Sequence, residues 1–192
     1  MSKKLIVLLA EGFEEVEAVT PIDYLRRAGF EVTVAAIGKE LLVCGAHGLK
    51  LSADTFLAAV LKEGKAWDGV VIPGGLPGAD NLAASEEVGA LIKELNQAGK
   101  LVAAICASPA WVLSPLGILA GKKFCCYPGA EQKVLSPASA SPGAKWIEDK
   151  VVVDGNIITS RGPGTAGEFA LAIVAKLAGE EEAKKQRKQL LL

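Results

Sequence analysis

The residue of this 192-residue chain whose side chain is best suited to do chemistry is Cys106. It lies between the apolar run LVAAI at 101–105 and the helix-like stretch ASPAWVL at 107–113. A thiol at a strand-to-helix turn receives the positive end of a helix dipole and free backbone N–H groups, and both favour the thiolate. Lowering its pKa from about 8.5 to about 6 requires roughly 3 kcal/mol of environmental preference. The turn therefore predicts an activated cysteine.

A glycine-rich turn, PGGLPG at 73–78, follows another predicted strand. Ligands of open α/β sheets bind beyond the carboxyl ends of the strands, so this turn is expected to lie near Cys106. Gly74 and Gly75 can then present backbone N–H groups that stabilise a developing oxyanion. A PGG sequence on its own is more typical of a simple tight turn, and only the pairing with Cys106 makes it specific.

Three carboxylates, Glu14, Glu15 and Glu17, fall in the first turn of the helix predicted after the first strand. Acidic residues at this end of a helix usually interact with its dipole, and that is the interpretation for Glu14 and Glu15. Glu17 shares the direction of the helix's apolar stripe, which includes Pro21 one turn later. It is therefore predicted to point toward the edge of the sheet.

His47 is the only histidine, so a Cys–His pair within one chain would have to use it. Its short loop favours a surface or interface position, with a reach into a site as the alternative. The cysteines are Cys44, Cys106, Cys125 and Cys126, and they lack the C-x-x-C spacing of zinc and dithiol sites. No metal site is predicted, and the four residues are interpreted as reduced thiols of a cytoplasmic protein.

The composition argues against several classes of function. Basic and acidic residues nearly cancel, at 21 against 22, so no global field draws the chain to nucleic acid or to anionic membranes. The longest apolar runs are far shorter than the roughly 20 residues that a membrane-spanning helix needs. A small, neutral or weakly charged partner fits this composition better, and no secretory signal is expected.

The elements that must position these residues alternate between strand and helix patterns. Strands are predicted at 5–10, 31–37, 69–72 and 101–105, and helices at 14–28, 85–98 and 168–177. Two further strands, 150–154 and 156–160, flank a hairpin-like Asp-Gly-Asn break. The alternation predicts a mostly parallel sheet with helices on both faces. A single domain is expected over 1–192, with a charged tail at about 180–192 as a solvated helix or frayed end.

Four motifs occur in one order along the chain: AEGFEEVEAVTPID at 10–23, VVIPGGLPGADNL at 70–82, AAICASP at 103–109 and ITSRGPGT at 158–165. On these motifs the chain resembles the ThiJ/PfpI superfamily, specifically its DJ-1 branch, from Lys4 to about Leu177. The resemblance implies a flavodoxin-like three-layer sandwich, a homodimer and a nucleophile-elbow cysteine at Cys106.

The resemblance also implies how the site is built. Glu17 would be protonated and hydrogen-bonded to the Cys106 sulfur, and the backbone N–H groups of Gly75 and Ala107 would form an oxyanion or sulfinate cradle, without any cofactor. A neutral acid is physically consistent with this role, because a charged carboxylate would raise the pKa of the thiol.

Some positions depart from the superfamily pattern or extend the site. In the protease-like members that the chain resembles less closely, a histidine directly follows the nucleophilic cysteine and pairs with it. In this chain Ala107 occupies that position, so peptidase or amidase action is not expected. Tyr127 replaces a histidine found in many animal DJ-1 proteins. His47 falls near an arginine that reaches across the dimer in the family, so His47, Asp23 and Arg27 are candidates for contact with the partner's pocket.

Two functions follow from the resemblance. The first is a glyoxalase (lyase) or a protein or nucleotide deglycase (hydrolase) acting on small 2-oxoaldehydes or their adducts. The alternative is an oxidative-stress sensor or redox-regulated chaperone in which Cys106 is oxidised to sulfinate. A third possibility is a structural dimer with a vestigial site. A thiolate with anion donors serves both of the first two functions, so the residues alone leave them open.

Overall fold

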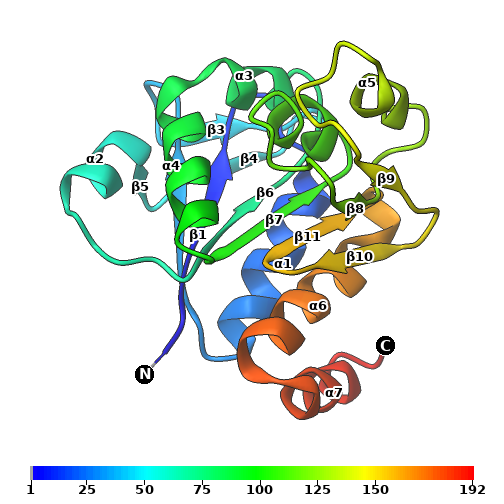
Figure 1. Ribbon diagram of the computed structural model, residues 1–192. Coiled ribbons are helices and arrows are strands. Elements are labelled where there is room, and N and C mark those ends of the chain that lie inside the picture. The colour runs from blue at the N-terminus through cyan, green and yellow to red at the C-terminus, as the bar shows by residue number, and fades with distance from the viewer. Residues whose placement is uncertain (1) are drawn as a thin grey trace.

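The fold is a three-layer α/β sandwich, seen in a computed structural model that describes residues 2–192 (Figure 1). Its central sheet has seven strands in the order β10-β11-β7-β6-β1-β2-β5. These strands are β1 (Lys4–Leu9), β2 (Glu31–Ala36), β5 (Thr55–Phe56), β6 (Gly69–Ile72), β7 (Leu101–Ile105), β10 (Val151–Asp154) and β11 (Ile157–Ser160). Only β10 runs antiparallel to its neighbour, which confirms the predicted flavodoxin-like, mostly parallel sheet.

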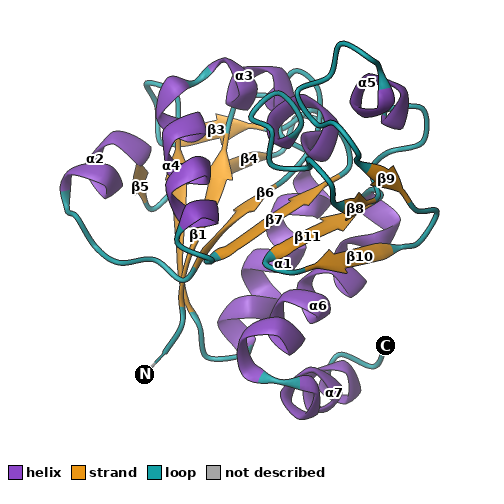
Figure 2. Cartoon of the chain, in the orientation of Figure 1, coloured by secondary structure: helices purple, strands orange, loops and turns teal. Residues whose placement is uncertain are grey.

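Helices cover both faces of this sheet (Figure 2). One face carries α1 (Glu15–Arg27), α6 (Ala166–Ala178) and α7 (Glu180–Gln189), and the other carries α2 (Leu57–Lys62), α3 (Gly78–Ala84), α4 (Glu86–Gln97) and the π-helical turn η1 (Pro109–Leu113). The remaining elements are β3 (Leu42–Cys44), β4 (Lys50–Ser52), β8 (Lys123–Phe124), β9 (Lys145–Trp146), α5 (Glu131–Leu135) and the 3₁₀ turn η2 (Pro163–Thr165). Among the described residues, no helix is both long enough and apolar enough to cross a bilayer.

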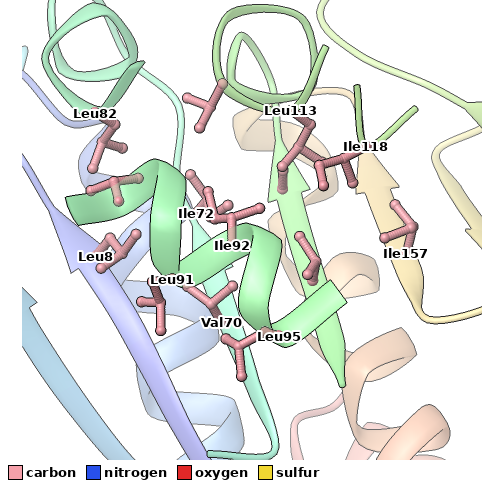
Figure 3. Packing of buried hydrophobic residues seen from close by; sticks show 14 of the residues in the cluster. Leu8, Val70, Ile72, Leu82, Leu91, Ile92, Leu95, Leu113, Ile118 and Ile157 are labelled. Carbon is pink, nitrogen blue, oxygen red and sulfur yellow. The ribbon is translucent and has the colours of Figure 1, made fainter. Parts of the chain in front are cut away.

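The apolar strands are buried on both sides because each face of the sheet packs against helices. Along β1, Ile6 and Leu8 belong to the core beneath α4, while Leu5 and Val7 belong to the core beneath α1 and α6. Figure 3 shows the first of these cores, where side chains of α4 point toward β6. Such two-sided burial accounts for the continuous apolar runs that predicted these strands.

Two predicted elements differ from the observed ones. The helix expected after Cys106 is only the five-residue turn η1, and the chain leaves it at Ser114, just before Pro115 and Gly117. The charged tail does form a helix, α7, but it is not simply solvated, because Ala183 and Gln186 are buried. One apolar residue and one amide were too weak a pattern to reveal the packed side of that helix.

The sheet register brings the carboxyl ends of β6, β7 and β11 to the same edge. Ile72 pairs with Ala104, and Ile105 pairs with Ser160. The backbone N–H of Cys106 continues this ladder by donating to the Ser160 carbonyl at 3.0 Å. The turns that follow these strands therefore meet around Cys106.

Candidate functional site

Cys106 occupies a strained turn at the end of β7. Its φ angle of +64° lies in the left-handed region, which a residue with a Cβ adopts at a cost of roughly 1–2 kcal/mol. The conformation is held by two backbone hydrogen bonds: the N–H donates to Ser160, and the carbonyl accepts from the Tyr127 N–H at 2.8 Å. The turn leaves the residue partly exposed, whereas Cys125 and Cys126 are fully buried. Strain of this kind is concentrated at functional sites.

Glu17 lies beneath this turn and is 0% exposed. Its Oε2 accepts a hydrogen bond from the Gly74 N–H at 2.9 Å, which ties α1 to the loop after β6. Its Oε1 is buried as well and has no hydrogen-bond partner within residues 2–192. A buried carboxylate oxygen without a partner is costly, and protonation removes the part of that cost that comes from the negative charge.

The environment of Glu17 favours its neutral form. Burial raises the pKa of this carboxyl from its ordinary value of 4.5 to about 7, although the Cys106 thiol and the Gly74 N–H act in the opposite direction. The Glu14 carboxylate adds a smaller upward contribution. A substantial share of Glu17 is therefore protonated near neutral pH.

The pKa of the Cys106 thiol is raised, which contradicts the prediction that the turn by itself favours the thiolate. Burial, followed by the charge of Glu17, raises the pKa of Cys106 to about 12, whereas the Ala107 and Gly75 N–H groups lower it. The short η1 turn cannot supply the dipole of a full helix. Glu17 stabilises the Cys106 thiolate only when Glu17 is protonated. The negative charge of Glu17 then disappears, and its O–H can donate a hydrogen bond to the sulfur.

Close packing fixes the glycine turn against Cys106. A Cβ atom on Gly74 would lie 2.6 Å from the Cys106 Cβ and 2.7 Å from Oε2 of Glu17. Gly75 has a φ of +90°, and a Cβ there would lie 2.4 Å from the backbone nitrogen of Glu14. Glycine is thus required at both positions by space, and at Gly75 also by conformation.

Ser108 joins the two turns and was not singled out by its sequence position. Its buried hydroxyl donates to the Pro73 carbonyl at 2.6 Å, across 35 positions of sequence. This bond holds the loop carrying Gly75 against the turn carrying Ala107. Nothing in the local sequence distinguishes Ser108 from a serine that simply begins a helix.

Replacing Ser108 with alanine is expected to lower the free energy of unfolding by about 1–3 kcal/mol, because the buried Pro73 carbonyl loses its partner. The measurement is urea unfolding of the variant beside Ser136→Ala, which changes an exposed serine near α5. An equal stability for the two variants would contradict the role given to the Ser108 hydroxyl.

His47 belongs to a different cluster and pairs with carboxylates. Its Nδ1 lies 3.0 Å from Oε2 of Glu15 and 3.4 Å from Oε2 of Glu14, while the side chain is 71% exposed. Glu15, interpreted from sequence as an ordinary helix-dipole residue, is instead buried, and its Oε1 accepts the backbone N–H groups of His47 and Leu49. These contacts lower the pKa of Glu15 and raise that of His47.

The same three side chains are the one group of potential metal ligands that the described residues bring together, with ligand atoms within 4.8 Å of one another. Sequence spacing missed them because Glu14 and Glu15 are 32 or more positions from His47. A protonated His47 between two carboxylates accounts for the arrangement without an ion.

Asp23 and Arg27 lie further along α1 and pair with each other at 2.7 Å. Both side chains are about half exposed, and within residues 2–192 neither forms a hydrogen bond or an ion pair with Cys106. Their suggested contact with a partner's pocket remains a prediction.

The fold and the site define a class of protein: a mostly parallel α/β sandwich with a partly exposed cysteine in a strained turn above a buried glutamate. The chain belongs to the DJ-1/PfpI family, whose profile matches residues 3–176. It is 43% identical to the protein dj-1beta of Drosophila melanogaster, with 100% of this chain and 98% of that protein covered.

Other relatives differ in length and in name. The chain is 43% identical to DJ-1 homolog B of Arabidopsis thaliana but spans only 40% of that protein, while covering 95% of itself. A glutathione-independent glyoxalase of Caenorhabditis elegans is 38% identical, with 98% of this chain and 95% of the relative covered. The solved structure of oxidized Toxoplasma gondii DJ-1 superposes with a TM-score of 0.90 at 42% identity, covering 99% and 98% of the two chains.

Proposed function

We propose that this protein is a cysteine-dependent, cofactor-free enzyme of the glyoxalase or deglycase type, acting on small 2-oxoaldehydes or their adducts. The observation that carries the proposal is the buried Glu17 carboxyl, with its raised pKa, beside Cys106 and the N–H groups of Gly75 and Ala107. Its relative in Caenorhabditis elegans bears the name of a glutathione-independent glyoxalase. A peptidase is not proposed, because the site offers Cys106 no histidine base: His47 is engaged by Glu14 and Glu15.

The overall reaction needs no redox cofactor. A 2-oxoaldehyde plus water gives a 2-hydroxy acid, in which the aldehyde carbon is oxidised and the adjacent ketone carbon is reduced. The protein has only to add a nucleophile, move one proton between the two carbons and admit water. A cysteine with one carboxyl group is sufficient for these steps.

Each step can be assigned to a group in the site. The Cys106 thiolate attacks the aldehyde carbon, and Glu17 gives its proton to the resulting oxyanion, which the N–H groups of Gly75 and Ala107 stabilise. The Glu17 carboxylate then removes the proton from the former aldehyde carbon, and the electron pair passes to the ketone oxygen to give an enediolate, which takes over the proton of the neighbouring hydroxyl. Return of that proton to the second carbon leaves a thioester on Cys106. Water hydrolyses the thioester, which releases the hydroxy acid and restores the thiolate and the neutral acid.

The direct test compares lactate formation from methylglyoxal by the wild type and by Cys106→Ser. Loss of the thiol is expected to lower kcat/KM by at least about 100-fold, since a serine hydroxyl is a far weaker nucleophile at neutral pH. Cys44→Ser is the matched control, because Cys44 is the other partly exposed cysteine and lies in the β3 strand. Equal turnover by Cys106→Ser and the wild type would exclude the proposal.

A second candidate function is a redox sensor or redox-regulated chaperone. It is favoured by the partial exposure of Cys106 among donors suited to an anion, while Cys125 and Cys126 are buried. Oxidation to the sulfinate would place two negatively polarised oxygens near the Gly75 and Ala107 N–H groups. Mild peroxide should then add two oxygens to the intact mass, located on Cys106 alone. Oxidation spread evenly over Cys44 and Cys106 would count against this function.

The proposal includes a homodimer in the cytoplasm. Support comes from the outer side of α1, which exposes Val16 and Val19 at 47% each, and from the adjoining loop, where Leu49 is 67% exposed. Apolar side chains gathered on one surface are typical of an interface. A dimer formed there would place His47, which lies two residues before Leu49, close to the partner chain.

A further inference from the structure

Two largely buried carboxylates at the start of α1 lack a lysine or arginine partner. The side chains of Glu14 and Glu15 are 13% and 6% exposed. Within residues 2–192, His47 is the one basic side chain whose nitrogen lies within 4.0 Å of either carboxylate. Buried charges in proteins are paired with an opposite charge or coordinate a metal ion. This cluster, which takes no part in the Cys106 chemistry, therefore has a charge pattern that suits a bound cation.

The three side chains place their ligand atoms at spacings close to those of a coordinated ion. Nδ1 of His47 lies 3.0 Å from Oε2 of Glu15 and 3.4 Å from Oε2 of Glu14, and the ligand atoms all lie within 4.8 Å of one another. Zinc binds imidazole nitrogen and carboxylate oxygen at about 2.0–2.2 Å, so the ligand atoms of a tetrahedral zinc lie roughly 3.3–3.6 Å apart. Movement of the exposed His47 ring and of the Glu14 side chain is enough to reach that geometry.

The backbone around Glu15 fixes this carboxylate as a ligand. Its Oε1 accepts the N–H groups of His47 at 2.7 Å and of Leu49 at 3.3 Å, while its Oε2 faces the His47 ring. A Cβ atom on Gly45 would lie 2.4 Å from Oε1, so the hairpin between β3 and β4 closes tightly on the carboxylate. Metal ligands in proteins are oriented by hydrogen bonds of this kind to their other polar atom. Glu15 is thus held in position before an ion binds.

We propose that Glu14, Glu15 and His47 bind one divalent transition-metal cation, for which Zn²⁺ is the best match. Imidazole and carboxylate ligands suit zinc, and three protein ligands leave a fourth position open to water. The two carboxylates balance the charge of the ion, which takes the place of the proton that His47 carries in the ion-free arrangement. The ion connects the β3–β4 hairpin to the first turn of α1. It has no part in the reaction proposed for Cys106, and the site does not depend on that function.

The test is a titration of metal-free protein, without a histidine tag, with Zn²⁺ by calorimetry and NMR. His47 is the only histidine, so its imidazole C–H signals report directly whether this ring binds the ion. We expect one ion per chain and a shift of these signals. His47→Ala and Glu14→Gln are each expected to weaken the affinity by at least about 10-fold. Glu40→Gln, which changes an exposed loop carboxylate, should keep the wild-type affinity.

Glu15→Gln is expected to weaken the affinity as well. His47→Ala, at a position whose side chain is 71% exposed, keeps the test decisive if this buried variant fails to fold. Mg²⁺ is the control ion and should leave the His47 signals in place, because it prefers an octahedral set of oxygen ligands.

Thiols also bind zinc, so the two partly exposed cysteines need a control of their own. The double variant Cys44→Ser with Cys106→Ser is expected to keep both the stoichiometry and the shift of the His47 signals. Wild-type affinity in His47→Ala, or loss of binding in the double cysteine variant, overturns the proposal. An equal response to Mg²⁺ also overturns it. One ion per two chains does so too, because the ligands would then be shared between chains.

Discussion

Glu17→Gln is expected to make the protein more stable than the wild type at pH 8, by about 3 kcal/mol, while the two have similar stability below pH 4.5. Burial raises the pKa of Glu17 from 4.5 to about 7 in the folded state. A raised pKa means that the neutral acid contributes stability that is complete below the unfolded pKa of 4.5 and is lost as the pH rises through 7. Glutamine cannot ionise, so the variant avoids that loss.

Urea unfolding from pH 4.5 to pH 8 measures this effect. The wild type should lose stability relative to Glu17→Gln across the window, whereas Glu40→Gln, which changes an exposed loop carboxylate, should follow the wild-type profile. Parallel profiles for the wild type and Glu17→Gln would show that the carboxyl is not held neutral by burial. A stabilising substitution at a functional position is expected where function requires a buried, titrating group.

The same substitution is expected to slow turnover by about 10²- to 10⁴-fold, because an amide cannot carry the proton between the two substrate carbons. The alkylation rate of Cys106 against pH shows which group holds the proton. Replacing a neutral acid that donates to the thiolate by a weaker amide donor raises the apparent pKa of the thiol. A lower apparent pKa in Glu17→Gln would instead mean that Glu17 is charged beside a neutral thiol.

Gly74→Ala is expected to reduce both stability and activity. The new Cβ would lie 2.6 Å from the Cβ of Cys106, 2.7 Å from Oε2 of Glu17 and 3.1 Å from the Ile105 carbonyl oxygen. Two of these neighbours are main-chain or Cβ atoms, which cannot move aside as a flexible side chain does. We expect a loss of about 1–3 kcal/mol in unfolding free energy, typical of an overpacked interior.

The loss of kcat/KM in Gly74→Ala should be larger than its loss of stability explains. Any relief of this contact separates Cys106 from Glu17, and misplacement of reacting groups by about 1 Å can cost roughly 100-fold in rate. Gly38→Ala is the matched control, because a Cβ at Gly38 would have no neighbour within 4 Å. Wild-type kcat/KM for methylglyoxal in Gly74→Ala would show that the glycine turn does not set the geometry of the reaction.

The sequence was sufficient to predict the sheet and the position of the cysteine. The run at 5–10 has no polar residue, and such runs form strands covered on both faces. The alternation of strand and helix patterns then predicts a mostly parallel sheet with helices on both faces. Because strand ends of a parallel sheet gather at one edge, the turns holding Cys106 and Gly74 were expected to meet, and the register of β6 and β7 places them together.

The protonation of Glu17 and Cys106 depends on tertiary structure. The pKa values of Glu17 and Cys106 arise from burial, which no local pattern reports, and burial opposes the thiolate that the turn alone suggested. Ser108 and Pro73 are 35 positions apart, yet their hydrogen bond joins the loop that carries Gly75 to the turn that carries Ala107. Local sequence determines backbone preference and apolar periodicity, which act over a few residues. Desolvation and packing sum over segments distant in the chain, so only the folded structure decides them.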